Sequence, residues 1–577
     1  MKEVRVFVVA AVIFGFGASA PVAMADPPCS CPAECQKMVP PPDGDPELLL
    51  CDDPDMPLTP LQGQALEAIA GEHGGVRKSR GTVAIRVPAA QLQTAEAALR
   101  HAAAAFERGV IVEPNHRYKA LAPTPRPTPI DTAYSSQWAL DNTGAQGNQG
   151  CTKDADVNVL EAWGAFGPYE EPADENLVVA VIDDGLTFAP DLVDNVWVNH
   201  AERLGAKGTD DDKNTYDDDL HGIDARNLTG FEPGSADTAH GTQVSSIIAA
   251  TGDNKDDVNP NMAGVIWRSK LAICATDFYA QELVDCLRYF VKLKDAGTNI
   301  VAVNVSAGGP RCSCCIEREL RRLRERGVLV VAGAGNEHEN NDVVSATTCP
   351  VYPASNRVSN VLSVAASTCS DAVWNPGAKG SALGRRTVHV AAPGQTITTV
   401  DGASFTPFSD FAGTSASAPH VTGLIALLKA KEPCLDWKAL RNLVIAGGTP
   451  LSSFTETISG RRIRAWDENG TGSMTCTGQK VRRRLFPLGD TAPVKVGSKV
   501  PLLYMSIDCA SSDGPVPVEV FDGATSVDTF SLADDGVAPD EIAGDGEFAG
   551  WFTPGTTGTF KLKFHGVDAE ALTVPVS

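Results

Sequence analysis

The stretch Leu177-Val178-Val179-Ala180-Val181-Ile182, followed by Asp183-Asp184-Gly185, decides the fold of this chain. Its apolar run has no polar face, which is typical of a strand that is covered on both sides. Such strands belong to buried parallel sheets, and polar functional residues gather at the carboxyl ends of their strands. The sequence therefore predicts a layered α/β core with Asp183 at the functional edge of its sheet.

Further apolar runs repeat this pattern along the middle of the chain. They alternate with segments such as Gln281–Lys294 and Ile316–Arg326, whose apolar residues recur at helical spacing. Alternating strands and helices predict a three-layer, doubly wound, mainly parallel sheet. The strands expected beside the first are Val301–Ser306, Val328–Ala332, Val361–Ala365 and Val388–Gly394.

Two other segments place a histidine and a serine at the starts of predicted helices. His240 precedes the apolar residues Ile247–Ala250, and Ser415 lies among small residues in Phe411–His420. A serine hydroxyl is a poor nucleophile unless an imidazole takes its proton and a carboxylate orients that imidazole. Each motif alone is more typical of a turn or of a tightly packed helix start. Together with Asp183 they predict an Asp–His–Ser triad.

These three segments carry a resemblance to a known family. Val181–Gly185, His240–Thr242 and Gly413–Pro419 resemble the catalytic blocks of the subtilisin-like serine peptidases, and their order is that of subtilisin. The resemblance extends over approximately residues 130–469 and implies the subtilisin-like three-layer fold. It implies Asp183 as the orienting acid, His240 as the general base and Ser415 as the nucleophile, with no cofactor for catalysis.

The same resemblance assigns further residues to the site. Asn336, in Gly333-Ala334-Gly335-Asn336, becomes the side-chain donor of an oxyanion hole, since an amide NH₂ donates without giving up its proton. The resemblance places Val351 near the floor of the primary specificity pocket, where a valine would shorten it. The walls of that pocket are Ser306, Ala307, Gly308, Gly333, Ala334 and Gly335.

The sequence before the core predicts an export signal followed by a maturation unit. Residues 1–25 are typical of a secretory signal peptide, with an apolar part too short for a confident membrane span. Residues 26–129 comprise a leader, which looks disordered to about Pro60, and a small α/β unit with a proline-rich linker at Pro123–Pro129. The unit resembles the propeptide of the family, a folding aid and inhibitor that makes the chain a zymogen. The alternative is a permanent accessory domain.

Its secondary structure is expected to be a strand over Thr82–Val87, a helix over Gln91–Arg108 and a strand over Val110–Val112. The peptidase-like domain is expected over residues 130–475, and short strands with Gly, Asp and Pro turns predict a β-sandwich over 490–577. That sandwich is either a binding module or, more simply, a stabilising appendage.

Composition limits which binding partners and which cellular compartment are expected for this protein. A formal net charge of -24 argues against nucleic acid or an anionic membrane surface as the partner. No stretch after the signal peptide is apolar enough to span a bilayer. The 15 cysteines favour disulfides in an oxidising compartment, and their odd number leaves at least one thiol unpaired or bonded to another molecule. The expected protein is secreted, extracellular or periplasmic, and acts on protein or peptide substrates.

An acidic run at residues 210–219 offers closely spaced oxygen donors. It resembles calcium-carrying insertions of some family members, and hard cations prefer such ligands. The predicted ligands of a structural Ca²⁺ are Asp210, Asp212, Asn214 and Asp217. The alternative is a solvated acidic loop.

Two other function classes compete with a peptidase. An α/β-hydrolase esterase needs a Gly-x-Ser-x-Gly elbow and the order Ser, acid, His, whereas Ser417 occupies the place of the second Gly here. A non-catalytic binding protein would not need an intact triad together with Asn336. The sequence therefore favours a secreted serine endopeptidase that works through an acyl-enzyme on Ser415.

Overall fold

The computed structural model of this chain describes a defined set of residues. These are 47–51, 76–77, 83–86, 99, 111–115, 119–120, 134–144, 150–166, 177–234, 238–252, 262–345, 349–402, 407–466 and 472–577. The predicted signal peptide, residues 1–25, and the proline-rich linker, residues 123–129, lie outside them. No helix among the described residues is both long enough and apolar enough to cross a membrane.

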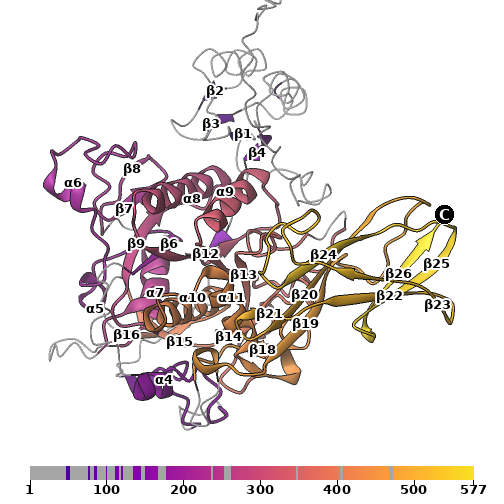
Figure 1. Cartoon of the computed structure of the whole chain (residues 1–577). Helices are drawn as coiled ribbons and strands as arrows, with labels where there is room; N and C mark the ends of the chain where they lie inside the picture. Colours follow the sequence, from indigo (N-terminus) through magenta and orange to yellow (C-terminus); the bar gives the residue numbers. More distant parts are fainter. Residues whose placement is uncertain are drawn as a thin grey trace, which may run out of the picture.

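Among the described residues, a ten-stranded sheet forms the centre of the molecule (Figure 1). Strand β6 (Val178–Asp183) pairs in parallel with β10 (Ile300–Val305) on one side and with β9 (Lys270–Ala275) on the other. Only the edge pairs are antiparallel. The sheet order is β17 (Thr449–Pro450), β18 (Arg461–Arg462), β14 (Val390–Pro393), β13 (Val361–Ser367), β12 (Leu329–Gly333), β10, β6, β9, β7 (Gly222–Asp224) and β8 (Thr229–Gly230).

Helices cover both faces of this sheet, and alternate residues of β6 pack against different helical layers. Val179 and Val181 pack in the core shared with α7 (Ala239–Ala249), α10 (Thr414–Lys431) and α11 (Trp437–Ala446). Ala180 and Ile182 pack in the core shared with α8 (Ala280–Asp295) and α9 (Cys314–Glu325). Figure 1 shows the two helical layers on either side of the strands. The predicted three-layer, mainly parallel fold is confirmed.

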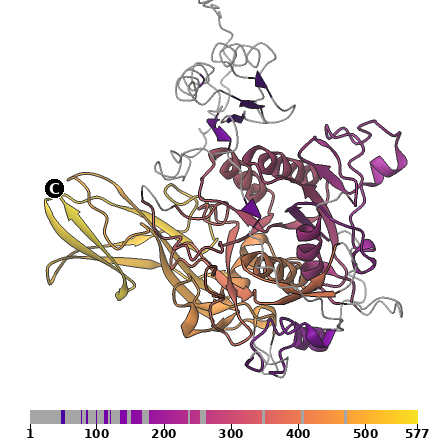
Figure 2. The ribbon, with the colours of Figure 1, turned by 180° about the vertical axis from the view of Figure 1, so that it is seen from behind.

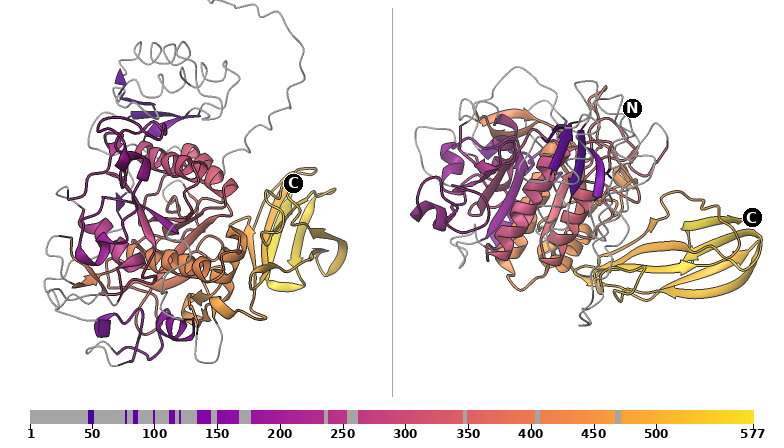
Figure 3. Two further views of the ribbon diagram at one scale, coloured as in Figure 1. Left: turned by 60° about the vertical axis from the view of Figure 1, so that its left-hand side comes forward. Right: turned by 90° about the horizontal axis from the view of Figure 1, so that it is seen from above.

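A small antiparallel sheet precedes this core, in the order β2 (Val76–Arg77), β3 (Val83–Arg86), β1 (Glu47–Cys51) and β4 (Ile111–Asn115). The expectation of disorder up to Pro60 is wrong at β1, which pairs with both β3 and β4. A five-residue strand between proline- and aspartate-rich segments gives too short a local signal to be recognised. Of the predicted helix Gln91–Arg108, the described residues include Leu99, which is helical and buried. Figure 3 shows this sheet beside the α8 and α9 layer.

Two four-stranded antiparallel sheets form the C-terminal part of the chain. Their facing sides bury an aromatic and aliphatic core, in which the Tyr504 and Phe564 rings stack with their centroids 5.3 Å apart. The first strand already begins at Lys480, before the predicted boundary at residue 490. One sheet holds β19 (Lys480–Phe486), β20 (Val500–Asp508), β21 (Ser511–Ser512) and β24 (Glu547–Phe552). The other holds β23 (Thr525–Leu532), β22 (Val516–Asp522), β25 (Gly558–Phe564) and β26 (Val567–Val576).

The sandwich is fastened to the central domain by a continuous core. Val481, Met505 and Ile507 of β19 and β20 belong to the same buried cluster as Leu440 and Leu443 of α11. Figure 2 shows the sandwich projecting from this side of the sheet.

Disulfides are present, as predicted for an oxidising compartment. Cys476–Cys509 closes the junction with the sandwich, with 5.6 Å between the Cα atoms. Within the central domain, Cys151–Cys369 and Cys274–Cys286 are also bonded. In the part of the chain that the structure describes, the free cysteine is Cys434, which is exposed.

Candidate active site

The carboxyl end of β6 meets the start of α7. Asp183, the last residue of β6, is wholly buried, and its Oδ1 atom lies 2.6 Å from Nδ1 of His240 in the first turn of α7. The opposite ring nitrogen, Nε2, is buried and has no hydrogen-bond partner among the described residues. The His240 ring also contacts Phe411 edge-on, with 5.3 Å between ring centroids. Asp183 thus fixes which nitrogen of His240 remains available for chemistry.

Asp184 holds the same histidine by its backbone. Its Oδ2 atom accepts the N–H of His240 at 3.1 Å, and its Oδ1 atom accepts the N–H of Gly241 at 2.7 Å. These are N–H groups of the first turn of α7, which have no partner within the helix. A carboxylate at a helix start is also favoured by the helix dipole. In the sequence, Asp184 stands out only as part of the Asp-Asp-Gly triplet. The structure shows that its carboxylate positions the start of α7.

The electrostatics of the pair favour a histidine that binds protons more readily than usual. Burial opposes the charged form, but the charge and hydrogen bond of Asp183, with the charge of Asp184, raise the pKa of His240 above its usual value. Burial and the neighbouring Asp183 carboxylate raise the pKa of Asp184 to about 7, against the lowering effect of His240. An imidazolium formed at His240 would therefore be stabilised by carboxylates on two sides.

Ser415 lies in the first turn of α10, which packs against α7 and against strands β10, β12 and β13. Pro419 within the helix has no N–H, so the Ser415 carbonyl lacks its usual helical partner. The Ser306 hydroxyl donates to that carbonyl at 3.0 Å, and the Ser415 hydroxyl donates to the Ser306 carbonyl at 3.2 Å. This exchange ties the start of α10 to the segment that follows β10.

Asn336, three residues beyond the end of β12, points its amide group toward the start of α10. Its Oδ1 atom accepts the backbone N–H of Thr414 at 2.9 Å and the Thr414 hydroxyl at 3.0 Å. Because these donors fix Oδ1, the NH₂ group must face the other way. That Nδ2 atom is buried and has no partner among the described residues. Gly413, with φ of 100°, permits the approach, since a Cβ there would lie 2.9 Å from Nδ2.

The predicted pocket walls lie on neighbouring segments. Ala307–Gly308 forms β11 directly after β10, and Gly333 ends β12. Val351 lies between the walls, because a Cβ at Gly308 would be 2.6 Å from its Cγ1 and a Cβ at Gly335 would be 2.8 Å from its Cγ2. The valine side chain thus occupies space that the glycines leave.

One pocket wall is paired with the N-terminal region. Strand β5 (Lys119–Ala120) runs antiparallel to β11, with Ala120 opposite Ala307 and Lys119 opposite Gly308. Extended backbone therefore lies along the wall by strand addition, which is how extended peptides bind to exposed strand edges.

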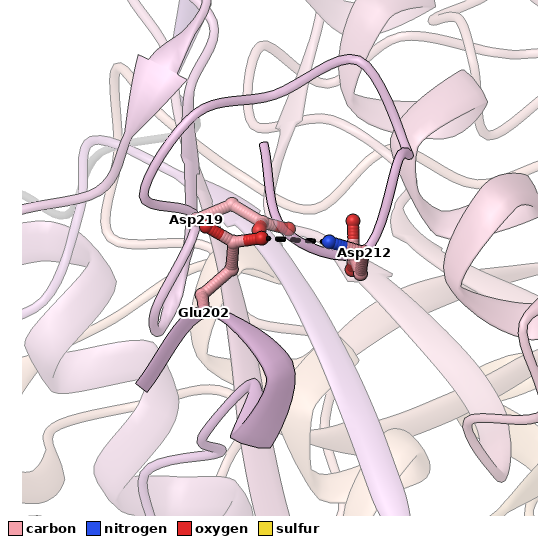
Figure 4. Close-up of side chains that lie close together, drawn as sticks. All are labelled: Glu202, Asp212 and Asp219. Atoms are coloured by element: carbon pink, nitrogen blue, oxygen red, sulfur yellow. Dashed lines mark hydrogen bonds between the residues drawn. The ribbon is translucent and has the colours of Figure 1, made fainter. Parts of the chain in front are cut away.

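The acidic loop gathers a different set of carboxylates from the predicted one. Glu202 of α6 (His200–Leu204), Asp212 and Asp219 place one oxygen each within 4.8 Å of one another (Figure 4). The set predicted from the sequence, Asp210, Asp212, Asn214 and Asp217, shares Asp212 with this cluster. Asp210 accepts the N–H groups of Asn214 and Thr215 and so closes the loop on itself. Asp217 is exposed, and the Asn214 amide donates to Asp212 and Asp219.

The sequence run could not reveal this set. Glu202 lies outside the run, and the hydrogen bonds from Asp211 N and Asp212 N to its carboxylate form only when the loop folds back over α6. Burial raises the pKa of Asp219 to about 7, with hydrogen bonds from Tyr289 and Asn214 opposing it and the Asp212 and Glu202 charges adding to it.

Comparison with known proteins places this site in one family. The model of the subtilase family matches residues 174–456. The chain carries a subtilase domain. Asp183, His240, Asn336 and Ser415 all lie within the matched range. The resemblance inferred from the three sequence blocks is thereby confirmed at the level of the family.

Individual relatives match about half of the chain. Subtilisin-like protease 1 of Plasmodium berghei is 30% identical over 299 residues, which are 49% of this chain and 48% of that protein. An extracellular protease of Xanthomonas campestris is 30% identical over 328 residues, or 53% of this chain and 50% of the relative. The chain thus spans about half the length of these curated relatives. Among solved structures, fervidolysin of Fervidobacterium pennivorans has 18% identity and a TM-score of 0.48, covering 92% of this chain and 73% of that one.

Proposed function

We propose that this chain is a secreted serine endopeptidase whose catalytic residues are Asp183, His240 and Ser415. The observation that carries the proposal is the hydrogen bond of 2.6 Å between Asp183 and His240 Nδ1, which leaves Nε2 of a buried imidazole without a partner. A buried polar atom without a partner is costly, and such atoms are retained where a reaction uses them.

The chemistry follows the roles of these groups. Ser415 Oγ attacks the carbonyl carbon of the scissile bond while His240 Nε2 takes its proton. The imidazolium then protonates the leaving nitrogen as the C–N bond breaks, which leaves an acyl-enzyme. Water, deprotonated by His240, attacks the ester, and the proton returns to Ser415. Asp183 keeps its charge throughout and stabilises the imidazolium.

The attack requires a small movement of the nucleophile. In the structure the Ser415 hydroxyl donates to the Ser306 carbonyl, whereas His240 Nε2 accepts nothing. Catalytic hydrogen bonds are often made only when substrate arrives. Rotation of the Ser415 side chain toward His240 would replace one hydrogen bond by another.

Asn336 is proposed to stabilise the oxyanion. Its unpartnered Nδ2 lies beside the start of α10, where the Ser415 N–H supplies a second donor and the helix dipole a partial positive charge. An amide that is already held by Thr414 needs no reorientation when charge develops. The pocket with Val351 between its glycine walls is proposed to select small or short side chains at P1.

Maturation is proposed to be intramolecular. The pairing of β5 with β11 supports the view that the N-terminal unit is an inhibitory propeptide, because its last described strand lies along the pocket wall. Cleavage after this segment, between about Lys119 and Ser136, would release it. The export signal in residues 1–25 and the extracellular relatives support secretion.

A structural Ca²⁺ is proposed at Glu202, Asp212 and Asp219. The donor set fits a hard cation, since three carboxylates converge and none of the ion pairs found among the described residues involves them. Burial raises the pKa of Asp219 most, and the charges of Asp212 and Glu202 raise it further; a divalent cation would relieve the repulsion among the three carboxylates. The ion would stabilise the loop and take no part in peptide hydrolysis.

One experiment tests both hydrolysis and maturation. The full chain and its Ser415→Ala and His240→Ala variants are expressed with the signal peptide, then assayed on a quenched fluorescent peptide and sequenced from the N-terminus. Both variants should lose about 10⁶-fold in kcat, the magnitude known for subtilisin. Ser415→Ala should accumulate a precursor that retains residues 81–119, whereas active enzyme should begin between about Lys119 and Ser136.

Separate outcomes would contradict the catalytic assignment and the maturation proposal. Hydrolysis near the wild-type rate in either variant would end the catalytic assignment. A mature active chain that begins near Asp26 would show that the N-terminal unit is a permanent domain.

A further inference from the structure

A solvent-open hollow of about 490 Å³ lies at the junction of the subtilase domain and the C-terminal sandwich. One wall comes from residues 342–344, from Thr387 and from four residues between 350 and 357, and the other from Phe486 at the end of β19 with Leu488 and Gly489. Its apolar side chains include Val344, Tyr352, Phe486 and Leu488. Ligand sites commonly combine such apolar walls with a few polar groups, and domain junctions are favoured places for them.

Arg357 is the unpaired cation of this hollow. Its guanidinium carbon lies 3.9 Å from the centre of the Phe486 ring, so the group is stacked on one wall. No salt bridge or hydrogen bond joins it to another described residue. The nearby carboxylate of Glu317 is engaged by Arg321 at 2.9 Å and by the Asn356 amide at 3.3 Å. In a chain with 72 acidic and 48 basic residues, an arginine left without a carboxylate is a departure from the charge balance.

A second donor without a partner belongs to the same wall. Ser355 is 7% exposed, and its hydroxyl has no hydrogen-bond partner among the described residues. The acidic group of the hollow, Asp342, is already satisfied by the Arg386 N–H at 3.0 Å and the Thr387 hydroxyl at 2.9 Å. The hollow thus offers an unpaired guanidinium and an unpaired hydroxyl, while its own carboxylate is engaged.

We propose that this hollow binds an acidic residue of a polypeptide, with its carboxylate on Arg357 and Ser355 and its apolar neighbours on the Tyr352, Phe486 and Leu488 walls. A guanidinium presents a planar fork that matches a carboxylate. Stacking on Phe486 holds the fork in place before the ligand arrives. Charge complementarity and apolar walls together fit an acidic residue flanked by apolar ones, rather than a strongly hydrated anion.

The hollow is separate from the primary specificity pocket but shares a segment with it. Tyr352 lines the hollow and directly follows Val351, which lies between the pocket walls Gly308 and Gly335. The backbone of Tyr352 also exchanges two hydrogen bonds with Gly309, at 2.8 and 2.9 Å. A polypeptide bound in the hollow would therefore contact the segment that shapes the pocket. The inference concerns binding and does not depend on the proposed peptidase reaction.

The test measures peptide binding to the full chain carrying Ser415→Ala, so that no probe is cleaved. The probe is a fluorescently labelled pentapeptide, blocked at both ends, with glutamate between two leucines. Its twin carries glutamine, which has the same shape without the charge, and phenylbutyrate represents a free apolar carboxylate. The glutamate peptide should bind at least about tenfold more tightly than the glutamine twin and than phenylbutyrate.

Three variants in the same background locate the site. Arg357→Gln should weaken binding of the glutamate peptide by at least about tenfold, to the level of the twin, and Arg357→Lys should lie between. Lys499→Gln, which removes an equal charge from an exposed position over Trp551, should leave binding unchanged.

Ser355→Ala keeps the test independent of folding. Removing a hydroxyl that has no partner should not lower the midpoint of thermal unfolding, yet it should weaken binding of the glutamate peptide severalfold. The proposal is overturned if Arg357→Gln binds that peptide as tightly as its parent, or if the glutamine twin binds equally well. Equal binding of phenylbutyrate would overturn the polypeptide as the ligand.

Discussion

The catalytic end of the sheet and the junction with the sandwich bury polar groups in opposite ways. Near Ser415, the buried atoms Asp183 Oδ2, His240 Nε2 and Asn336 Nδ2 have no hydrogen-bond partner among the residues that the structure describes. At the junction, the wholly buried Arg441 of α11 donates to the Ser359 carbonyl at 2.7 Å, to Glu547 at 2.7 Å and to the Asp545 carbonyl. In one region, groups with no described partner include those that the proposed reaction would use, whereas in the other, paired groups join the two domains.

The junction network is more extensive than this one arginine. Glu570 of β26 accepts hydrogen bonds from Arg385 and Arg483 at 2.8 Å each, and its backbone carbonyl accepts from Arg484 at 3.1 Å. Buried ion pairs add little net stability compared with apolar residues, but a broken pair is expensive. The network therefore specifies how the sandwich docks, which is more than an independent appendage would need.

The largest effect on this comparison is expected at the junction. Arg441→Met should lower the free energy of unfolding by about 3–5 kcal/mol, because Glu547 would be left buried without its cation. Denaturant unfolding of the purified chain measures the change. Lys438→Met, on the same helix but half-buried, removes one hydrogen bond to a carbonyl and a 3.8 Å ion pair with exposed Asp436; it is the matched control and should cost less than about 1 kcal/mol.

A compensating change sharpens this prediction. Adding Glu547→Leu to Arg441→Met should recover much of the loss, since an apolar pair can replace a buried ion pair. Peptidase activity per folded molecule should stay constant throughout. A single variant that is as stable as the wild type would show that the network does not fasten the domains.

At the proposed catalytic site, a substitution should lower the reaction rate more than the free energy of unfolding. Asn336→Ala should lower kcat by about 10²–10³-fold with little change in KM, the magnitude known for subtilisin. Its Nδ2 has no partner in the resting structure, so the loss of stability should be smaller than for Arg441→Met. Steady-state kinetics on a peptide substrate measure the rate, and an unchanged kcat would mean that another donor fills the oxyanion hole. Asn336→Asp keeps the acceptor for Thr414 but not the donor, and should also be slow.

The acidic loop should respond to calcium. At a hundredfold excess over Kd, Ca²⁺ should add about 2.7 kcal/mol to the free energy of unfolding. Without the ion, the folded pKa of Asp219, about 7, exceeds its unfolded value, so stability falls as pH rises from about 4 to 7. The calcium gain in melting temperature should therefore be larger at pH 8 than at pH 5. Asp219→Asn should abolish the gain, whereas Asp217→Asn, at an exposed position, should retain it. The reverse pattern would favour the ligand set predicted from the sequence, which includes Asp217.

The smallest effect is expected at Asp184. Asp184→Asn removes a charge that raises the pKa of His240, so the acid limb of the profile of kcat/KM against pH should move to lower pH. Under the proposed mechanism, activity requires neutral His240 and is lost as pH falls through its pKa, which lies above the usual value in the wild type. Asp528→Asn, an exposed aspartate of the sandwich, should leave the profile in place. An unmoved acid limb in Asp184→Asn would show that Asp184 acts on the backbone alone.

Local sequence patterns predicted the strands and helices that the same residues form. The apolar run before Asp183 became an interior strand, and the small residues around Ser415 became the start of a buried helix. The segment Glu47–Cys51 was missed because its strand is stabilised by two partners distant in sequence, β3 and β4. The cluster of Glu202 with Asp212 and Asp219 escaped the sequence for a similar reason, since Glu202 reaches the loop only after folding.

The sequence by itself determined the family, the layered fold and the residue types that could perform acyl transfer, because strand runs, helix starts and motif order are properties of neighbouring residues. Only the tertiary structure decided which polar atoms are paired. Asp184 on the start of α7, Asn336 with its NH₂ turned away from Thr414, and Arg357 without a carboxylate all depend on residues far apart in the chain. Hydrogen bonds act over about 3 Å, and a chain fixes distances of that size between remote residues only when its core is packed.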